Sequence, residues 1–373
     1  MIELTAGKDD AGRRLDRIIR KALPDLSLSL IHRLLRQKKI LVDNKPASPN
    51  SRIDQGMIIK VIADVNHETI TVNKKKKNII NQRNIQVSNK NFRLKPPVPI
   101  LWQGAGIIIF NKPSGLSTHG PNSLDTIVND WLAGGGSPLP RSLSFKPGPL
   151  HRLDKPTSGV IVFSQTLEGA KMFSALLREH KLEKTYIAIV EGCIEQDEGT
   201  GNREQGTGYS EIIWQDELAH DKKTRKSFVE TRKVYKARSP IPDPRSLIPI
   251  SKQAITVIKT LASNGGYSLI EARIMTGRHH QIRAQAASHG HPLAGDIKYG
   301  GKPFPGSEKA RGGCFFLHAW KIRFLELPDG FPGDFTGFIE AALPEAFLTQ
   351  IEKLFSMEAI RGVVQETGKG RGH

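Results

Sequence analysis

The chain has 373 residues, 38% of them hydrophobic, and a mean hydropathy of −0.35, values typical of one or two globular domains. Its two cysteines, Cys193 and Cys314, are too few for a disulfide framework and are not spaced as zinc ligands. The longest apolar runs fall far short of the roughly 18 residues that span a bilayer, so we expect a cytoplasmic protein without a membrane segment.

Positive charge is concentrated at the N-terminal end of the chain. The formal net charge is +18; residues 1–66 carry 13 Lys and Arg against 8 Asp and Glu, and residues 67–99 carry 8 against 1. Lys and Arg that neutralise phosphates release condensed counterions, which drives binding to polyanions. This asymmetry favours a nucleic-acid partner over a basic surface that is merely solvated.

Residues 1–66 are predicted to form two basic helices followed by a short strand pair. Apolar residues recur at helical spacing in "RRLDRIIRKAL", and Ser29 is a candidate N-cap for the helix in "LIHRLLRQKK". The segments "ILVDNKP" and "GMIIKVIA" predict strands. In this pattern the module resembles the S-four-like RNA-binding domain of a ribosomal small-subunit protein. The resemblance implies RNA contacts from the exposed basic residues Arg17, Arg33, Arg36, Lys38 and Lys39.

The remainder of the chain predicts a larger α+β domain. Residues 67–99 are polar and basic, which predicts a linker, and residues 357–373 predict a flexible tail. Between them, residues 100–356 alternate strand-like runs such as "GVIVF" with helical segments such as "TLEGAKMFSALLREH". We expect a mostly antiparallel mixed sheet flanked by helices and loops, with surface loops at 133–149, 195–226 and 239–251.

The common catalytic templates are absent, and the histidine-rich segment 277–291 is the strongest alternative to them. The chain has no GxxxxGK[ST], GxGxxG, HExxH or GxSxG motif. His279, His280, His289 and His291 could bind a transition metal in principle. We expect His279 and His280 to point in different directions on a helix, and the segment holds no acidic residue. We therefore expect neither a metal nor a cofactor.

Six motifs in order resemble one enzyme family. "HRLDKPTSG" is accompanied by "NKPSGLSTHG", "KLEKTYIAIVEG", "TGRHHQIR", "HPLAGDIKYG" and "LHAWKIRF", which together extend from about residue 100 to 325. In these motifs the chain resembles the RluA-type pseudouridine synthases. The layout with an N-terminal RNA-binding module is most similar to the large-subunit ribosomal RNA enzymes of the C type.

The resemblance implies a role for each matching residue. Asp154 would be the catalytic carboxylate, because a carboxylate can attack a sugar carbon or remove a sugar proton. Arg283 would hold Asp154, and Tyr186 would pack on the uracil. Arg152 would fill the gap left by the extruded nucleotide. Further RNA or structural contacts would come from Lys112 and Arg278.

The residues around these positions carry further expectations. Thr157, Ser158 and Gly159 are predicted to form a turn whose hydroxyls bond to the backbone and whose glycine supplies conformational freedom. Family members commonly have valine and histidine after "HQIR". Here Ala284 and Gln285 stand instead, so we expect an altered pocket wall.

Several functions remain open on the sequence alone. The favoured one is a monomeric, cofactor-independent pseudouridine synthase that flips a uridine out of structured RNA, with large-subunit ribosomal RNA expected over transfer RNA. A second is a non-catalytic RNA-binding protein of ribosome assembly. A third is a metal-dependent RNA hydrolase that uses the histidine cluster.

Overall fold

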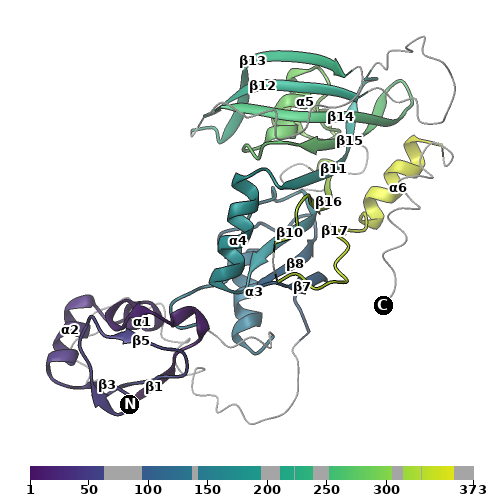
Figure 1. Cartoon of the computed structure of the whole chain (residues 1–373). Helices are drawn as coiled ribbons and strands as arrows, with labels where there is room; N and C mark the ends of the chain where they lie inside the picture. The colour runs from purple at the N-terminus through teal and green to yellow at the C-terminus, as the bar shows by residue number, and fades with distance from the viewer. Residues whose placement is uncertain are drawn as a thin grey trace. The chain divides into compact units, whose positions relative to one another are not determined.

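The computed structural model describes most of the chain (Figure 1). The described residues are 1–62, 95–136, 142–194, 211–221, 223–237, 252–304, 314–328 and 330–356. Nearly all of the expected linker at 67–99, and the whole of the expected tail at 357–373, lie outside them. Within the described ranges, no helix is long and apolar enough to cross a membrane.

The chain divides into two compact units. The first comprises Met1–Pro96, Asn129–Pro147 and Gln165–Glu168, and the second comprises Pro97–Val128, Gly148–Ser164 and Gly169–His373. Each unit is described by itself. The boundaries at residues 66 and 100 stay predictions.

The first unit is a small sheet with two amphipathic helices. The strand order is β1 (Ile2–Thr5), β6 (Ile58–Val61), β3 (Ile40–Val42) and β4 (Lys45–Pro46), and β2 (Arg13–Arg14) pairs separately with β5 (Arg52–Ile53). The helices are α1 (Leu15–Ala22) and α2 (Leu28–Arg36). Their apolar faces are fully or almost fully buried in one core, because Leu15, Ile18, Ile19, Ile31, Leu34 and Leu35 pack against strand residues such as Ile40 and Ile59.

Local chemistry explains the turns of this unit and corrects one expectation. Asp43 and Asn44 have φ values of 48° and 64°, the left-handed pair that a two-residue hairpin requires, so β3 and β4 form a hairpin, and β3 also pairs with β6 as expected. Helix α2 begins earlier than predicted. Its N-cap is Ser27, whose hydroxyl accepts a hydrogen bond from Leu30 N at 3.2 Å, and Ser29 lies inside the helix.

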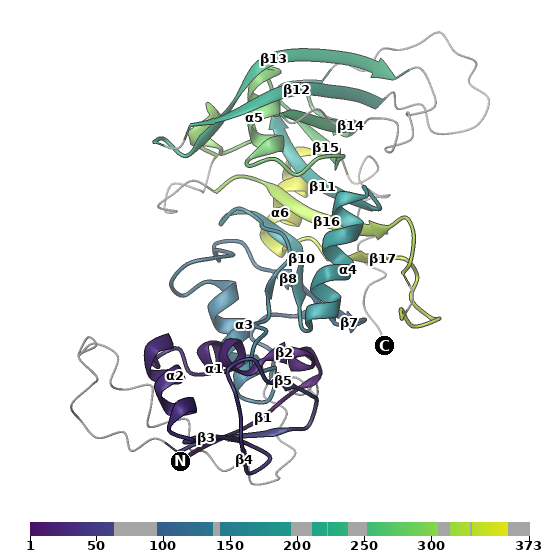
Figure 2. The ribbon, with the colours of Figure 1, turned by 60° about the vertical axis from the view of Figure 1, so that its left-hand side comes forward.

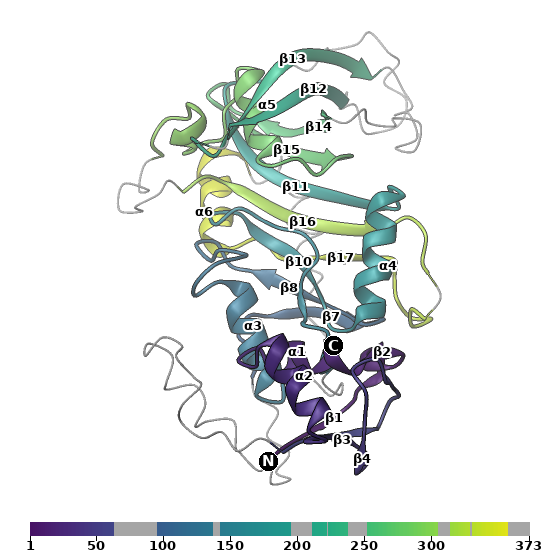
Figure 3. The same cartoon turned by 90° about the vertical axis from the view of Figure 1, so that its left-hand side faces the viewer.

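The second unit contains a long, mostly antiparallel sheet, which confirms the predicted α+β class. Within the described residues the strand order is β13-β12-β14-β15-β11-β16-β10-β8-β7, with β17 on β16 and β9 on β10 (Figure 3). The strands are β7 (Ile100–Gly104), β8 (Ile107–Lys112), β9 (Gly148–Pro149), β10 (Ser158–Ser164), β11 (Leu182–Glu191), β12 (Glu211–Asp221), β13 (Lys226–Ala237), β14 (Gln253–Ser263), β15 (Tyr267–Ile274), β16 (Leu317–Phe324) and β17 (Phe338–Glu340).

Helices cover both faces of this sheet. In Figures 1 and 3, α4 (Leu167–Arg178) and α6 (Glu345–Leu354) lie on opposite faces. Phe173 and Leu176 of α4 pack over β8 and β10, whereas Phe347 and Ile351 of α6 pack over β11 and β15. The remaining helices are α3 (Leu124–Ala133) and α5 (Gln281–Ser288).

The region expected to form a loop at 195–226 contains a strand. β12 pairs with both β13 and β14, and α5 lies against these strands (Figure 2). The buried positions of β12 include Asp216, which interrupts the apolar pattern of Trp214 and Leu218. The polar composition of this segment therefore conceals a strand, and the loop prediction is wrong for residues 211–221. The loop expected at 239–251 lies outside the described residues.

One parallel pairing fixes the start of β10. Ser158 and Gly159 pair with His318 and Ala319 of β16, whereas the other described pairings of this sheet are antiparallel. Gly159 has a φ of 108°, and a Cβ there would lie 2.1 Å from Ala319 O. Only glycine allows this close approach, so the turn that precedes β10 is held directly against β16.

Candidate active site

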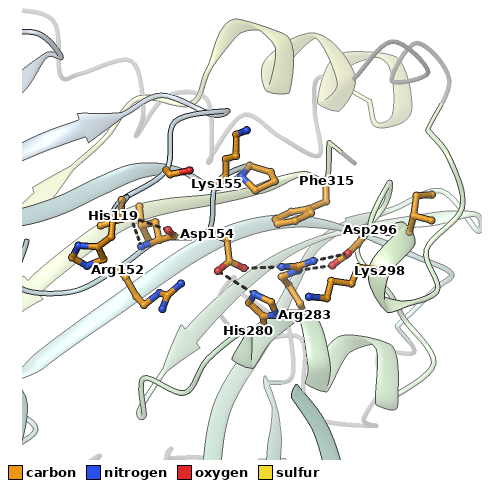
Figure 4. Close-up of a pocket in the computed structure, with 14 residues that line it drawn as sticks. His119, Arg152, Asp154, Lys155, His280, Arg283, Asp296, Lys298 and Phe315 are labelled. Atoms are coloured by element: carbon orange, nitrogen blue, oxygen red, sulfur yellow. Dashed lines mark hydrogen bonds and ion pairs between the residues drawn. The ribbon is translucent and has the colours of Figure 1, made fainter. Parts of the chain in front are cut away.

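Asp154 borders a large hollow in the second unit. The hollow has a volume of about 650 Å³, within the range of about 300–1,000 Å³ typical of ligand sites. The side chain of Asp154 is 16% exposed. Figure 4 shows the carboxylate among basic side chains, which are His119, Arg152, Lys155, His280, Arg283 and Lys298. The hollow therefore offers the Asp154 carboxylate beside several basic side chains.

The turn that carries Asp154 is anchored from two sides. Thr118 Oγ1 donates to Leu153 O at 2.8 Å and accepts from Leu153 N at 3.2 Å. Ser158 Oγ bonds to His318 Nδ1 at 2.8 Å. Because His318 Nε2 lies 3.0 Å from Ala341 O and donates to it, Nδ1 is the acceptor for the serine hydroxyl. Ser158 thus anchors the turn in the core; burial lowers the pKa of His318 to about 4, which keeps the imidazole neutral.

The structure brings Arg283 to Asp154, as the motif predicted. Arg283 Nη1 donates to Asp154 Oδ2 at 2.9 Å. The same guanidinium makes two bonds to Asp296, from Nε at 2.7 Å and from Nη2 at 2.8 Å. Its carbon Cζ lies 4.8 Å from the ring centre of Tyr299 and 4.3 Å from that of Phe315. Arg283 is 6% exposed, so three charged contacts and two aromatic faces fix its position.

His280 approaches the other carboxylate oxygen. Its Nε2 lies 3.5 Å from Asp154 Oδ1, and its Nδ1 lies 2.8 Å from Tyr299 Oη. Tyr299 Oη accepts from Ser227 N at 2.9 Å, so its own proton is available to His280 Nδ1. Burial lowers the pKa of His280 to about 3, Arg283 adds to the shift and Asp154 opposes it. The neutral ring therefore presents an Nε2–H group toward Asp154.

Tyr186 lies in a smaller inner pocket that also reaches Asp154. This pocket has a volume of about 70 Å³ and shares Arg152, Leu153, Asp154, His280 and Arg283 with the larger hollow. Tyr186 is 7% exposed on β11. Burial raises the pKa of its phenol, and Asp154 raises it further, so the hydroxyl keeps its proton at neutral pH.

Of the other site residues predicted in the second unit, two are exposed and one is buried. Arg152 is exposed and borders both pockets, and Arg278 is exposed and borders the inner one. Lys112 is fully buried, and its ammonium donates to the carbonyls of Pro113 at 3.0 Å, Leu116 at 2.7 Å and Lys155 at 3.3 Å. Of the two kinds of contact expected for Lys112, with RNA or within the structure, the observed ones are structural, because the buried ammonium is enclosed by backbone carbonyls.

The predicted RNA-contacting residues of the first unit lie on its helices and the turn after them. Arg17 of α1 and Arg33 and Arg36 of α2 are exposed, as is Lys38, and Lys39 is half-buried. Their charges are accessible to a phosphate backbone, which keeps the prediction open.

The histidine segment is arranged differently from the expectation. His279 and His280 precede α5, and their rings stack with centroids 3.7 Å apart, so the prediction that they point in different directions is wrong. His289 instead stacks on Trp214 and pairs with Asp216 at 3.0 Å, and His291 Nδ1 bonds to Glu191 O. Of the four histidines of this segment, only His280 borders the hollow or the inner pocket.

Ala284 and Gln285, which replace the valine and histidine common in the family, do not line either pocket. The expectation that they alter the pocket wall is therefore wrong. Gln285 is fully buried beneath the sheet, where its amide donates to Asp216 Oδ2 at 2.7 Å and accepts from Thr256 Oγ1 at 2.6 Å. Ala284 packs in an apolar cluster with Leu218. Both side chains are buried, and neither lines the hollow or the inner pocket.

Four residues of the site received no role from the sequence. These are His280, Asp296, Tyr299 and Phe315, which surround Arg283 or touch Asp154. Asp296 and Tyr299 lie in "HPLAGDIKYG", so the motif contained them. Their function as partners of Arg283 required the fold, because sequence spacing alone does not reveal which basic residue an aspartate meets.

Comparison with known proteins identifies the family. Residues 106–288 match the family model described as RNA pseudouridylate synthase. The chain belongs to this family. Residues 13–59 match the model described as S4 domain. Both resemblances drawn from the motifs are therefore confirmed, and the protein is an RNA pseudouridine synthase, an isomerase, with an S4 domain.

Curated relatives align over most of the chain. "Ribosomal large subunit pseudouridine synthase D" of Neisseria meningitidis serogroup A is 28% identical over 92% of this chain and 79% of its own length. "Ribosomal large subunit pseudouridine synthase C" of Haemophilus influenzae is 26% identical over 88% of each chain. The solved structure titled "Human RNA Pseudouridylate Synthase Domain Containing 4" covers 68% of this chain and 92% of its own, at 22% identity and a TM-score of 0.48.

Proposed function

We propose that this synthase isomerises specific uridines of large-subunit ribosomal RNA and that Asp154 is its catalytic carboxylate. The observation that carries the proposal is the pairing of Asp154 with Arg283 at the edge of an accessible hollow. The names of the two relatives, synthases D and C of the large ribosomal subunit, support the substrate.

The reaction asks little of the protein beyond positioning and one carboxylate. The bond between N1 and C1′ breaks, the uracil turns while bound, C5 joins C1′, and the C5 proton is released. Two routes are open to Asp154: attack at C1′, or removal of a sugar proton. In either route Arg283 holds Oδ2, which leaves Oδ1 to face the substrate beside the Nε2–H of His280. No step calls for a cofactor.

The surrounding residues suit a flipped nucleotide. A base extruded from its stack needs a flat apolar surface, which the buried ring of Tyr186 supplies in the inner pocket. Arg152 is exposed at the same pocket and can stack in the vacated position. Basic groups beside the two pockets and on the S4 domain would neutralise phosphates; they are the exposed Lys155, Arg278, Arg17, Arg33, Arg36 and Lys38 and the half-buried Lys39.

The alternatives lack a comparable observation. Transfer RNA remains the second candidate substrate, because the hollow itself does not depend on the class of RNA. A purely non-catalytic assembly protein would not need Asp154 held by Arg283 beside an accessible hollow. A metal-dependent hydrolase would need several side chains that point to one metal ion. His289 instead pairs with Asp216 and His291 bonds to Glu191 O, so neither shares a contact with His280. A monomer acting in the cytoplasm suits a ribosomal substrate.

Release of the C5 hydrogen tests the function directly. The purified protein is incubated with transcripts that carry 5-tritiated uridine, from large-subunit RNA, small-subunit RNA and transfer RNA in parallel. We expect tritium release to water from the large-subunit transcript alone. Release from transfer RNA alone would contradict the proposed substrate, and no release from any RNA would contradict the proposed reaction.

A further inference from the structure

Thr157 carries a buried hydroxyl without a partner. The residue is 2% exposed, and its Oγ1 has no hydrogen-bond partner among the described residues. Its neighbours differ, because Ser158 Oγ is bonded to His318 and Thr118 Oγ1 to Leu153. An unsatisfied buried hydroxyl destabilises a folded protein, because it loses its hydration without gaining a partner, so it is rare without a functional reason.

Thr157 is one of the residues that line the inner pocket next to Asp154. Thr157 lines this pocket together with Tyr186 and the apolar side chains of Ile274, Ile282 and Leu317. Thr157 N also donates to Asp154 O at 3.1 Å, which places both residues in one turn. A group bound to the Thr157 hydroxyl would thus be held at a fixed position relative to the carboxylate.

Two other polar side chains of the pocket already have hydrogen-bond partners within the protein. Arg283 is bonded to Asp154 and Asp296. Gln281 Oε1 accepts from Thr276 Oγ1 and Arg278 N, and Gln281 Nε2 donates to Ile255 O and Thr256 Oγ1. A polar ligand that enters the inner pocket therefore finds these two side chains committed and the Thr157 hydroxyl available.

We infer that Thr157 donates a hydrogen bond to a carbonyl oxygen of the target uracil. This inference rests on the proposed function of the Asp154 site. A base that leaves water for a pocket with apolar walls loses the hydration of its carbonyl groups, and this loss is unfavourable unless the pocket replaces a hydrogen bond. The Thr157 hydroxyl replaces one, and the turn it shares with Asp154 then aligns the base with the carboxylate.

Thr157→Val tests the inference, because valine keeps the shape and removes only the hydroxyl. We expect kcat/KM for tritium release to fall by about 10- to 100-fold, while Thr157→Ser restores it to within about 3-fold of the parent. RNA affinity should change little, since phosphates dominate it. The unfolding midpoint of Thr157→Val should stay equal or rise, because no internal hydrogen bond is lost. Ser158→Ala is the matched control, and its midpoint should fall.

Sulfur substitution in the substrate identifies the contact. A transcript with 2-thiouridine or 4-thiouridine at the target position carries a weaker acceptor, so one of the two should react more slowly with the parent enzyme. In Thr157→Val that thio effect should largely disappear, because effects of groups in contact are not additive.

The outcomes separate the inference from the proposed function. Unchanged kcat/KM in Thr157→Val with an active parent would overturn the contact alone, as would thio effects that persist in full. A fall in activity matched by a fall in the unfolding midpoint would make Thr157 structural and also overturn it. An inactive parent protein would instead overturn the proposed function.

Discussion

Arg283 is the residue around which the site is built. Its guanidinium meets two carboxylates and lies between the rings of Tyr299 and Phe315. Three N–H groups in a planar fork are needed to bond Asp296 twice and Asp154 once. The position of the Asp154 carboxylate, the proposed catalytic group, therefore depends on the geometry of this guanidinium as well as on its charge.

Arg283→Lys should impair catalysis although it keeps the charge. A lysine ammonium cannot hold Asp296 at two oxygens and Asp154 at a third, so Asp154 loses its fixed orientation. We expect single-turnover pseudouridine formation to slow by about 100-fold or more, with RNA affinity within about 3-fold of the parent.

Arg273→Lys is the matched control for this substitution. Arg273 pairs with Glu183, Glu211 and Glu271 on the sheet and does not border the hollow or the inner pocket. Equal slowing in both variants, or normal turnover in Arg283→Lys, would contradict the role assigned to the guanidinium.

For single residues, the sequence predicted the contact between Asp154 and Arg283 but not the residues that surround it. Asp154 and Arg283 each stand in a motif of the family, and the family pattern places the two side chains together. Their contact could therefore be predicted although they are 129 residues apart in the sequence. Lys112 also stands in a motif, but from sequence alone a lysine is expected at the surface. Its burial among backbone carbonyls became apparent only from the fold. The contact of His280 with Asp154 depends on the left-handed backbone at φ 54°, which no pattern indicated.

The decisive element is the turn that joins residue 151 to β10. Lys112 reaches it from β8 through Lys155 O, Thr118 reaches it through Leu153, and His318 of β16 binds Ser158. Three segments distant in the sequence thus hold one short turn, which keeps Asp154 in place without help from a ligand.

Lys112→Met should loosen this turn. The substitution keeps the length of the side chain but leaves the carbonyls of Pro113 and Leu116 without their ammonium partner inside the protein. We expect the free energy of unfolding to fall by roughly 2–4 kcal/mol, since buried acceptors that lose a charged donor are costly. Chemical denaturation monitored by circular dichroism measures the change. A loss below about 0.5 kcal/mol would contradict the clamping role.

Apolar strands were predictable and half-polar ones were not. "GIIIF", "GVIVF" and "YIAIV" become β8, β10 and β11 because their central residues are buried on both faces of the sheet. β12 was not predicted because Asp216 occupies a core position, where it pairs with Gln285 of α5 and with His289, the residue after α5. That compensation comes from tertiary structure, which a local pattern does not contain.

For the whole molecule, charge and chemistry occupy different parts of the chain. The proposed catalytic groups belong to the second unit, whereas the exposed basic residues of α1 and α2 belong to the first. This division predicts that substrate affinity and turnover can be changed separately.

Neutralising α2 should weaken RNA binding and its salt dependence. In the triple variant Arg33→Gln, Arg36→Gln and Lys38→Gln, we expect the slope of log K against log salt to become shallower by about 2, or about 0.7–0.9 for each lost phosphate contact. Turnover at saturating RNA should remain within about 3-fold, because Asp154 and its partners are unchanged.

A variant with the same loss of charge elsewhere provides the control. Lys171, Arg178 and Lys353 are exposed on α4 and α6 and are absent from the predicted RNA contacts. If replacing them with glutamine flattened the salt dependence as much as the α2 variant, binding would depend on net charge rather than on the S4 domain.

Pseudouridine mapping in cells tests the central claim most directly. Ribosomal RNA is mapped in a strain that lacks the gene and carries either the parent protein or Asp154→Asn, which keeps the size of the side chain and removes its charge. We predict that defined large-subunit positions lose pseudouridine without the gene, regain it with the parent protein and remain uridine with Asp154→Asn at equal protein level. Full modification by Asp154→Asn, or unaltered large-subunit RNA in the strain without the gene, would contradict the account.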